Sequence, residues 1–329
     1  DYRTFDASEA MPFVPVFEDR FVGEGTSESY ALFGDVSYQL TDRLLLGVGG
    51  RYFHDEQETA QSDFVFLEPE LTKQSGEFDD FSPRGYLKFD LTDDVNLYAS
   101  VGSGFRSGGF NSPGDPPYDP ETVLAYEIGV KGSAAEGKLT FEAAGFFNDY
   151  SDMLRRGLVF NGLNFTSQLS NIGDVEVYGL EGGFAYEVIE DLTLSFSGAW
   201  IDTEVKEIRA DDATNLPGDE LDYVPELSFT VSGVREFEVK SHPAFARVDY
   251  SYRDEVSYID RTSFDVVPQF SDSINQLNAR LGITFDDVSV ELFGSNLLNE
   301  NKWLDPYHEW RNANRTRPRT VGVKVGFSY

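Results

Sequence analysis

The chain has 329 residues, of which 15% are aromatic, 30 are glycine and none is cysteine, and its formal net charge is −32. This composition excludes a disulfide framework and any cysteine-based metal or redox site. The negative charge argues against nucleic acid as a partner, because a polyanion would be repelled. No apolar run approaches the roughly 20 residues of a membrane helix, whereas a membrane β-strand needs only about ten residues of alternating character.

The N-terminal stretch differs from the rest of the chain. Residues 1–28 have no clean period, and Pro12 and Pro15 interrupt their main apolar run. From Ser29 onward, apolar and polar residues alternate. We therefore expect an outer-loop or partial-strand remnant over 1–28 and a repetitive all-β region over 29–329.

The predicted strands follow one another as hairpins. We expect strands over 30–40, 44–52, 84–89, 95–102, 124–131, 139–147, 178–186, 192–200, 227–231, 246–253, 277–285, 288–292 and 320–329.

The predicted connections alternate in length. Short turns are expected near Thr41, Asp93, Ser133, Asp191, Lys240 and Asp286. Long loops are expected over 54–80, 102–111, 155–164, 202–222 and 299–317 and after Arg253, two of them strongly acidic. Short turns at one end and long loops at the other are typical of outer-membrane barrels. The sequence therefore predicts a transmembrane antiparallel up-and-down β-barrel with about thirteen or fourteen strands in this chain.

Charged residues recur on one face of these strands. A small soluble barrel fills its interior with apolar side chains, whereas a membrane barrel is apolar outside and wet inside. We predict that the following residues face the lumen: Arg84, Lys88, Glu127, Lys131, Glu142, Arg247, Asp249, Arg280, Glu291 and Lys324. The alternative is an ordinary two-layer β protein with one solvated face.

Several segments resemble the TonB-dependent receptors of the Gram-negative outer membrane. The likeness rests on the order and spacing of Phe81–Asn111, Pro120–Gly132, Val177–Val188, Phe293–Trp303 and Arg317–Tyr329. The family usually ends in Phe, so Tyr329 is a mild departure.

The resemblance implies a roughly 22-stranded barrel that holds an N-terminal plug domain and is energised by the TonB complex of the inner membrane. This chain has no recognisable plug or TonB box and fewer strands. We therefore expect it to be the C-terminal part of a larger receptor, in contact with TonB only through that plug. Outer-membrane lipid and lipopolysaccharide are the expected surroundings.

No catalytic constellation stands out, so we expect no enzyme, no cofactor and no metal site. His54, His242 and His308 lie far apart and fit solvated positions best. Gly102–Phe110 is glycine-rich, but a proline-rich loop and no helix follows it, so it fails as a phosphate cradle.

The final long loop is the most ligand-like stretch of the sequence. It combines aromatic faces with guanidinium groups, which suits an anionic or aromatic ligand such as a ferric siderophore. The predicted ligand-binding residues are Trp303, Tyr307, Trp310, Arg311, Arg315 and Arg317. Pairing of these arginines with acidic loops or with lipopolysaccharide phosphates is the alternative.

The function that the resemblance implies is TonB-energised uptake of a scarce bulky nutrient, most often an iron–siderophore complex. Cobalamin, haem and oligosaccharide remain open as cargo for the same architecture. A passive porin-type diffusion channel and a soluble binding module are the competing functions. A plug-like stretch upstream of Asp1 would favour the first function, and a signal peptide followed directly by strands would favour the porin.

Overall fold

We describe the fold from a computed structural model, in which residues 23–62, 71–160, 165–209, 217–259, 268–305 and 314–328 are described. The strands are β1 (Gly23–Thr41), β2 (Leu44–Gln61), β3 (Thr72–Asp90), β4 (Val95–Arg106), β5 (Glu121–Ala134), β6 (Leu139–Ser151), β7 (Leu154–Phe160), β8 (Phe165–Asn171), β9 (Gly173–Ile189), β10 (Leu192–Ile208), β11 (Leu227–Val239), β12 (His242–Arg253), β13 (Ser257–Ile259), β14 (Pro268–Phe270), β15 (Ile274–Phe285), β16 (Val288–Ser295) and β17 (Thr320–Phe327). The described residues contain no helix that is long and apolar enough to cross a membrane.

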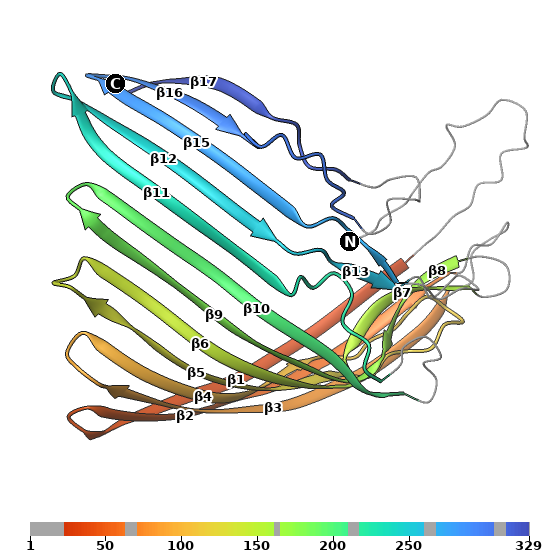
Figure 1. Cartoon of the computed structure of the whole chain (residues 1–329). Coiled ribbons are helices and arrows are strands. Elements are labelled where there is room, and N and C mark those ends of the chain that lie inside the picture. The colour runs from red at the N-terminus through yellow and green to blue at the C-terminus, as the bar shows by residue number, and fades with distance from the viewer. Residues whose placement is uncertain are drawn as a thin grey trace, which may run out of the picture.

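One antiparallel sheet of 13 strands forms the body, in the order β1-β2-β3-β4-β5-β6-β9-β10-β11-β12-β15-β16-β17. Figure 1 shows this sheet curving through space, with β1 and β17 as its two edges. Two small sheets, β7-β8 and β13-β14, lie at the end opposite the tight turns. The prediction of an all-β antiparallel architecture with about thirteen strands is confirmed.

The predicted alternation of short and long connections is also confirmed. Strand pairs such as β1/β2, β9/β10 and β15/β16 are joined by two residues each, all at the same end of the sheet (Figure 1). Several of these turns use a left-handed backbone at a non-glycine residue, for example Asp191 at φ 63° and Asp286 at φ 47°. Aspartate tolerates that conformation better than most residues, which is why these positions carry it.

The strands reach further than the sequence predicted. β2 continues to Gln61 and β3 starts at Thr72, so most of the predicted acidic loop over 54–80 is strand. β10 likewise continues to Ile208, β7 occupies part of the predicted 155–164 loop, and β1 starts at Gly23, six residues before Ser29. Both faces are polar in the extension of β2 from His54 to Gln61, so no apolar alternation marked it as a strand.

The two faces of the large sheet differ sharply. Direct cross-strand pairs share a face, and the series Asp35–Gly49–Arg84–Gly102 defines what we call the polar face. The opposite, apolar face exposes large side chains such as Leu32 (76% exposed), Ile128 (67%) and Val323 (63%). Such a broad exposed apolar band requires a covering, and lipid covers it in outer-membrane barrels.

The buried core is small and lies at the loop-bearing end of the sheet. Ile172, Val175 and Val205 are each at most 2% exposed, and the partly buried Tyr150 and Leu221 pack against them. This cluster joins the outer ends of β9 and β10 to the segments on either side. It holds the outer part of the sheet together without help from lipid.

Candidate functional site

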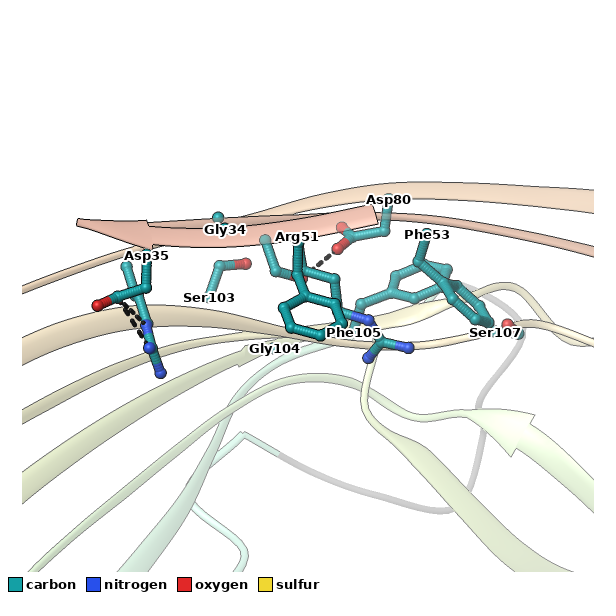
Figure 2. Close-up of a pocket in the computed structure, with 13 residues that line it drawn as sticks. Gly34, Asp35, Arg51, Phe53, Asp80, Ser103, Gly104, Phe105 and Ser107 are labelled. Carbon is teal, nitrogen blue, oxygen red and sulfur yellow. Dashed lines mark hydrogen bonds and ion pairs between the residues drawn. The ribbon is translucent and has the colours of Figure 1, made fainter. Parts of the chain in front are cut away.

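A cavity opens on the polar face, toward the outer end of the first four strands. Its volume is about 690 Å³. Figure 2 shows Arg51, Phe53 and Phe105 gathered on one side of the strand ribbons. The lining residues are Phe33, Gly34, Asp35, Gly50, Arg51, Phe53, Asp80, Ser82, Arg84, Ser103, Gly104, Phe105 and Ser107.

Arg51 supplies the free positive charge of this cavity. The alternation of β2 places Arg51 and Phe53 on the same face, and the guanidinium carbon lies 4.8 Å from the centroid of the Phe53 ring. The Phe53 and Phe105 rings are 6.1 Å apart at an angle of 57°. Within the described residues, no carboxylate forms an ion pair with Arg51. A guanidinium that stacks on a ring and has no anionic partner suits an anionic, aromatic group.

A second arginine at the cavity, Arg84, is already neutralised. Its Nη2 and Nε donate to Oδ2 of Asp35 over 2.8 and 3.0 Å, and the Tyr86 hydroxyl donates to Oδ1 of Asp35 over 2.9 Å. Further along the same strand, β3, the Ser82 hydroxyl donates to Asp80. Arg51 is therefore the cavity residue best placed to attract an anion.

The ten residues predicted to face the lumen all lie on the polar face. The register pairs Lys131 with Glu142 and Glu291 with Lys324, and Arg247 forms an ion pair with Asp249 at 2.7 Å. The cross-strand pairs, together with the alternation along each strand, place further predicted residues on that same face: Arg84, Lys88, Glu127 and Arg280. That this face lines a wet lumen stays a prediction for these residues.

The structure brings together two of the six predicted ligand-binding residues. The guanidinium of Arg315 lies 3.6 Å from the ring centroid of Trp303, and the two backbones form an antiparallel bridge. The backbone carbonyl of Arg317 accepts a hydrogen bond from Asn296 at 2.8 Å. Tyr307, Trp310 and Arg311 lie outside the described residues. A ligand role for these six residues stays a prediction.

The sequence reasoning missed Arg51 and the phenylalanines around it. The available signal was the alternation of residues 44–52, which already places Arg51 on the face of Phe33 in the preceding strand. The position of Phe105 at the cavity could not be predicted from this alternation, because β4 pairs with β3 only up to Gly102.

The described residues contain no group of three or more His, Asp or Glu side chains arranged to hold a metal ion. The lining of the cavity offers charge, hydroxyl groups and aromatic faces, which suit non-covalent recognition.

Comparison with known proteins identifies the family. The family described as TonB dependent receptor-like, beta-barrel matches residues 1–297. The chain belongs to this family. It is therefore an outer-membrane β-barrel segment of a TonB-dependent receptor, as its motifs suggested. Members of this family are transport proteins rather than enzymes, so the expectation that the chain is not an enzyme is confirmed.

Curated relatives include receptors for several ligands. The chain is 26% identical over 328 residues to the pesticin receptor of Yersinia pestis, covering 97% of this chain and 43% of that protein. It is also 26% identical over 300 residues to the metal-pseudopaline receptor CntO of Pseudomonas aeruginosa, covering 88% of this chain and 40% of that protein. The chain thus spans less than half the length of these relatives.

Solved structures of similar proteins agree on the fold. The ferric yersiniabactin uptake receptor FyuA from Yersinia pestis matches with a TM-score of 0.78 and 20% identity, over 94% of this chain and 47% of that one. The siderophore receptor PiuA from Acinetobacter baumannii matches with a TM-score of 0.74 and 19% identity, over 95% of this chain and 44% of that one. At these identities the likeness establishes the fold of the TonB-dependent receptor barrel, and only that.

Proposed function

We propose that this barrel segment forms the wall of a receptor that takes up an iron–siderophore complex across the outer membrane, driven by the TonB complex. The family match over residues 1–297 supports this proposal most strongly. The names of the relatives, which include a metal-pseudopaline receptor and a siderophore receptor, point to the same class of cargo.

The cavity at Arg51 supplies a way to contact such a cargo. Siderophores that carry carboxylates or phenolates are anionic, and the guanidinium over the Phe53 ring offers both charge and a stacking partner. We propose the Trp303–Arg315 pair in the last loop as a second contact of the same chemistry. The plug expected elsewhere in the receptor would complete the binding site and couple it to TonB.

Two alternatives stay open within this architecture. Cobalamin, haem or an oligosaccharide would use the same barrel as a different cargo. A passive diffusion channel would have the same kind of strands without energy coupling. The family match favours the energised receptor over the channel. The aromatic cavity contains Arg51, which forms no ion pair within the described part of the chain, and this favours an anionic cargo over a neutral sugar.

Uptake measurements test the energised transport. The full-length receptor that contains this chain would be expressed in a Gram-negative strain lacking its own siderophore receptors, and uptake of radioactive iron as ferric siderophores would be followed. We expect uptake to stop when a protonophore collapses the proton-motive force or when TonB is deleted. Unchanged uptake under both conditions would reject the energised receptor in favour of a channel.

Binding measurements test the cavity separately. Arg51→Gln should raise the concentration of ferric siderophore needed for half-maximal binding roughly tenfold, the loss expected for one charge-assisted hydrogen bond. Lys73→Gln is the matched control, because this exposed lysine lies on the opposite face of the sheet and has no part in the cavity. Equal binding by the two variants would show that the cavity does not contact the cargo.

A further inference from the structure

Aromatic side chains on the apolar face share a pattern at the level where the apolar band ends. Four of them donate their polar hydrogen to a carboxylate that lies at the same level or nearer the loop-bearing end. We call these pairs the aromatic–carboxylate row. The pairs and their donor–acceptor distances are Tyr52–Asp79 at 2.5 Å, Tyr178–Asp202 at 2.8 Å, Trp200–Glu226 at 3.0 Å and Tyr252–Asp254 at 3.1 Å.

The row lies at the height expected of a membrane boundary. Its members stand about ten residues along the strands from the short turns, which is the length of a membrane-crossing strand. On the turn side of the row, the same face carries exposed apolar residues such as Leu180 and Val248. Tyrosine and tryptophan concentrate at this level because their rings are apolar and their tips are polar.

On the loop side of the row, the same face is strongly acidic. Glu28, Glu56 and Glu77 lie directly opposite one another on β1, β2 and β3. Asp149, Glu176 and Glu204 do the same on β6, β9 and β10. Like charges in directly opposed positions repel each other, so these carboxylates gain from any positive or hydrogen-donating group nearby.

Two basic side chains near this level, Lys206 and His54, contact carboxylates. Lys206 forms ion pairs with Glu204 at 3.0 Å and with Glu176 at 3.4 Å. His54 contacts Asp79 through Nδ1 at 2.9 Å. These contacts use part of the positive charge near the row, and the exposed Lys73 lies further toward the loops on the same face.

The hydrogen-bond donors of the row are already in use, whereas acceptor sites on its carboxylates remain available. Each tyrosine or tryptophan has one polar hydrogen, and the pairs above use it. An ionised carboxylate has about four acceptor sites, so it can accept further bonds. The side chain of Asp79 remains 55% exposed while accepting from Tyr52 and His54. The surface therefore offers acceptors and negative charge to whatever lies against it.

We propose that the aromatic–carboxylate row is an interaction surface for lipid headgroups that donate hydrogen bonds through ammonium or hydroxyl groups. Headgroups that present phosphate without such donors meet carboxylates of like charge and aromatic groups whose polar hydrogens are already donated. The aromatic rings fix the depth of the barrel in the bilayer, and the carboxylates favour lipids whose headgroups donate hydrogen bonds. This inference is independent of the cargo that the receptor carries.

Two lipids with the same phosphate provide a direct test. The full-length receptor would be reconstituted in phosphatidylcholine vesicles and in phosphatidylcholine–phosphatidylethanolamine vesicles with matched acyl chains. The ethanolamine ammonium has N–H donors, whereas the choline ammonium has the same charge and none. We expect the thermal unfolding midpoint to be several degrees higher with ethanolamine. Equal midpoints in the two lipids would overturn the proposal.

Variants separate this contact from general effects of the lipid. The double variant Asp79→Asn, Asp202→Asn keeps an acceptor oxygen for each tyrosine but removes the charge, and should lose the preference for ethanolamine. The control Asp42→Asn, Asp93→Asn makes the same charge change in the short turns and should keep the preference. A preference that survives in the first variant, or disappears in the control, would contradict the role of the row.

A further double variant covers the case in which the asparagine variant does not insert. Tyr52→Phe, Tyr178→Phe removes the tyrosine donors and leaves both carboxylates with one more free acceptor site. The preference for ethanolamine should then persist or increase. Its loss in this variant would show that the tyrosine hydroxyls, and not the carboxylates, contact the headgroups.

Discussion

The ring of Tyr98 on β4 covers Gly129, its direct partner on β5. A Cβ added at Gly129 would lie 2.5 Å from the ring carbon Cζ, well inside contact distance. Lys131, two residues further along β5, places its Nζ 4.8 Å from the centroid of the same ring. Glycine thus allows the ring to lie against the wall of the sheet, on the polar face.

Replacing this glycine should destabilise the barrel. Gly129→Ala forces the Tyr98 ring or the strand to move, and overpacking of this kind costs about 1–3 kcal/mol. The free energy of unfolding in urea, measured on full-length receptor in lipid vesicles, should fall by that amount. Gly85→Ala is the control, because a Cβ at Gly85 would meet nothing closer than 3.9 Å. Equal stability of the two variants would contradict the steric role of Gly129.

Arg209 ties together segments that are far apart in sequence. Its Nη1 donates to Asp119 at 2.8 Å and to Asp152 at 3.0 Å. Asn171 adds bonds from its Nδ2 to the carbonyls of the same two residues, at 3.0 and 2.8 Å. The start of β5, the end of β6 and the outer end of β10 are therefore clamped at one point.

Loss of the charge should loosen this clamp locally. Because the Arg209 side chain is a third exposed, we expect Arg209→Gln to cost at most about 1 kcal/mol, or a roughly fivefold shift in local opening. Hydrogen exchange should speed up by that factor at the amides of residues 119 and 171. Lys206→Gln removes a cation from the same strand with different partners, and should leave these amides unchanged.

The ionisation of Tyr223 offers a pH-dependent readout of the loop-bearing end. Tyr223 lies between β10 and β11, and its ring centroid is 5.4 Å from that of Tyr258. Burial, aided by the negative charge of neighbouring groups, raises the pKa of Tyr223 to about 12. A raised pKa in the folded protein contributes stability below the ordinary value of about 10, which is lost as the pH rises through 12.

An absorbance titration measures this ionisation. The difference between the receptor and its Tyr223→Phe variant should show one phenol titrating near pH 12. Tyr258→Phe removes a neighbouring hydroxyl group that contributes to the raised pKa of Tyr223, and should lower that midpoint without restoring the ordinary value, since burial is the main cause. A midpoint near 10 in the unaltered receptor would show that the phenol is solvated.

The Trp303–Arg315 pair provides a prediction about the last loop. If the loop contacts the cargo, Arg315→Lys should weaken binding of ferric siderophore two- to fivefold, because lysine lacks the planar group that stacks on Trp303. Arg319→Lys, a substitution at an exposed arginine outside the pair, should leave binding unchanged. If binding is equal in both variants, the pair serves the structure of the loop and not the cargo.

Much of the fold could be predicted from the sequence because lipid and water impose opposite demands on alternate residues. Leu87 and Arg84 follow that alternation, and the turns at Asp93 and Asp286 carry their own local signal. The extensions of β2 and β3 could not be predicted this way. Both faces of the segment from His54 to Gln61 meet polar surroundings, so its residues lack any period that separates strand from loop.

The candidate site was harder to predict than the fold. Arg51 could be assigned to a face, but its lack of an anionic partner among the described residues depends on the pairing of Asp35 with Arg84, two strands away. That pairing is set by the register of three strands and not by any local motif. The stacking of Arg315 on Trp303 similarly depends on how the two ends of one loop meet.

The small dry cluster of Ile172, Val175 and Val205 has a practical consequence for handling the receptor. The broad apolar band needs lipid or detergent as its solvent, whereas this cluster is sealed by protein alone. A receptor extracted into a poor detergent would therefore distort first around its middle and keep its outer rim intact. Probes that recognise the rim would report a native protein after the membrane-facing wall had begun to fail.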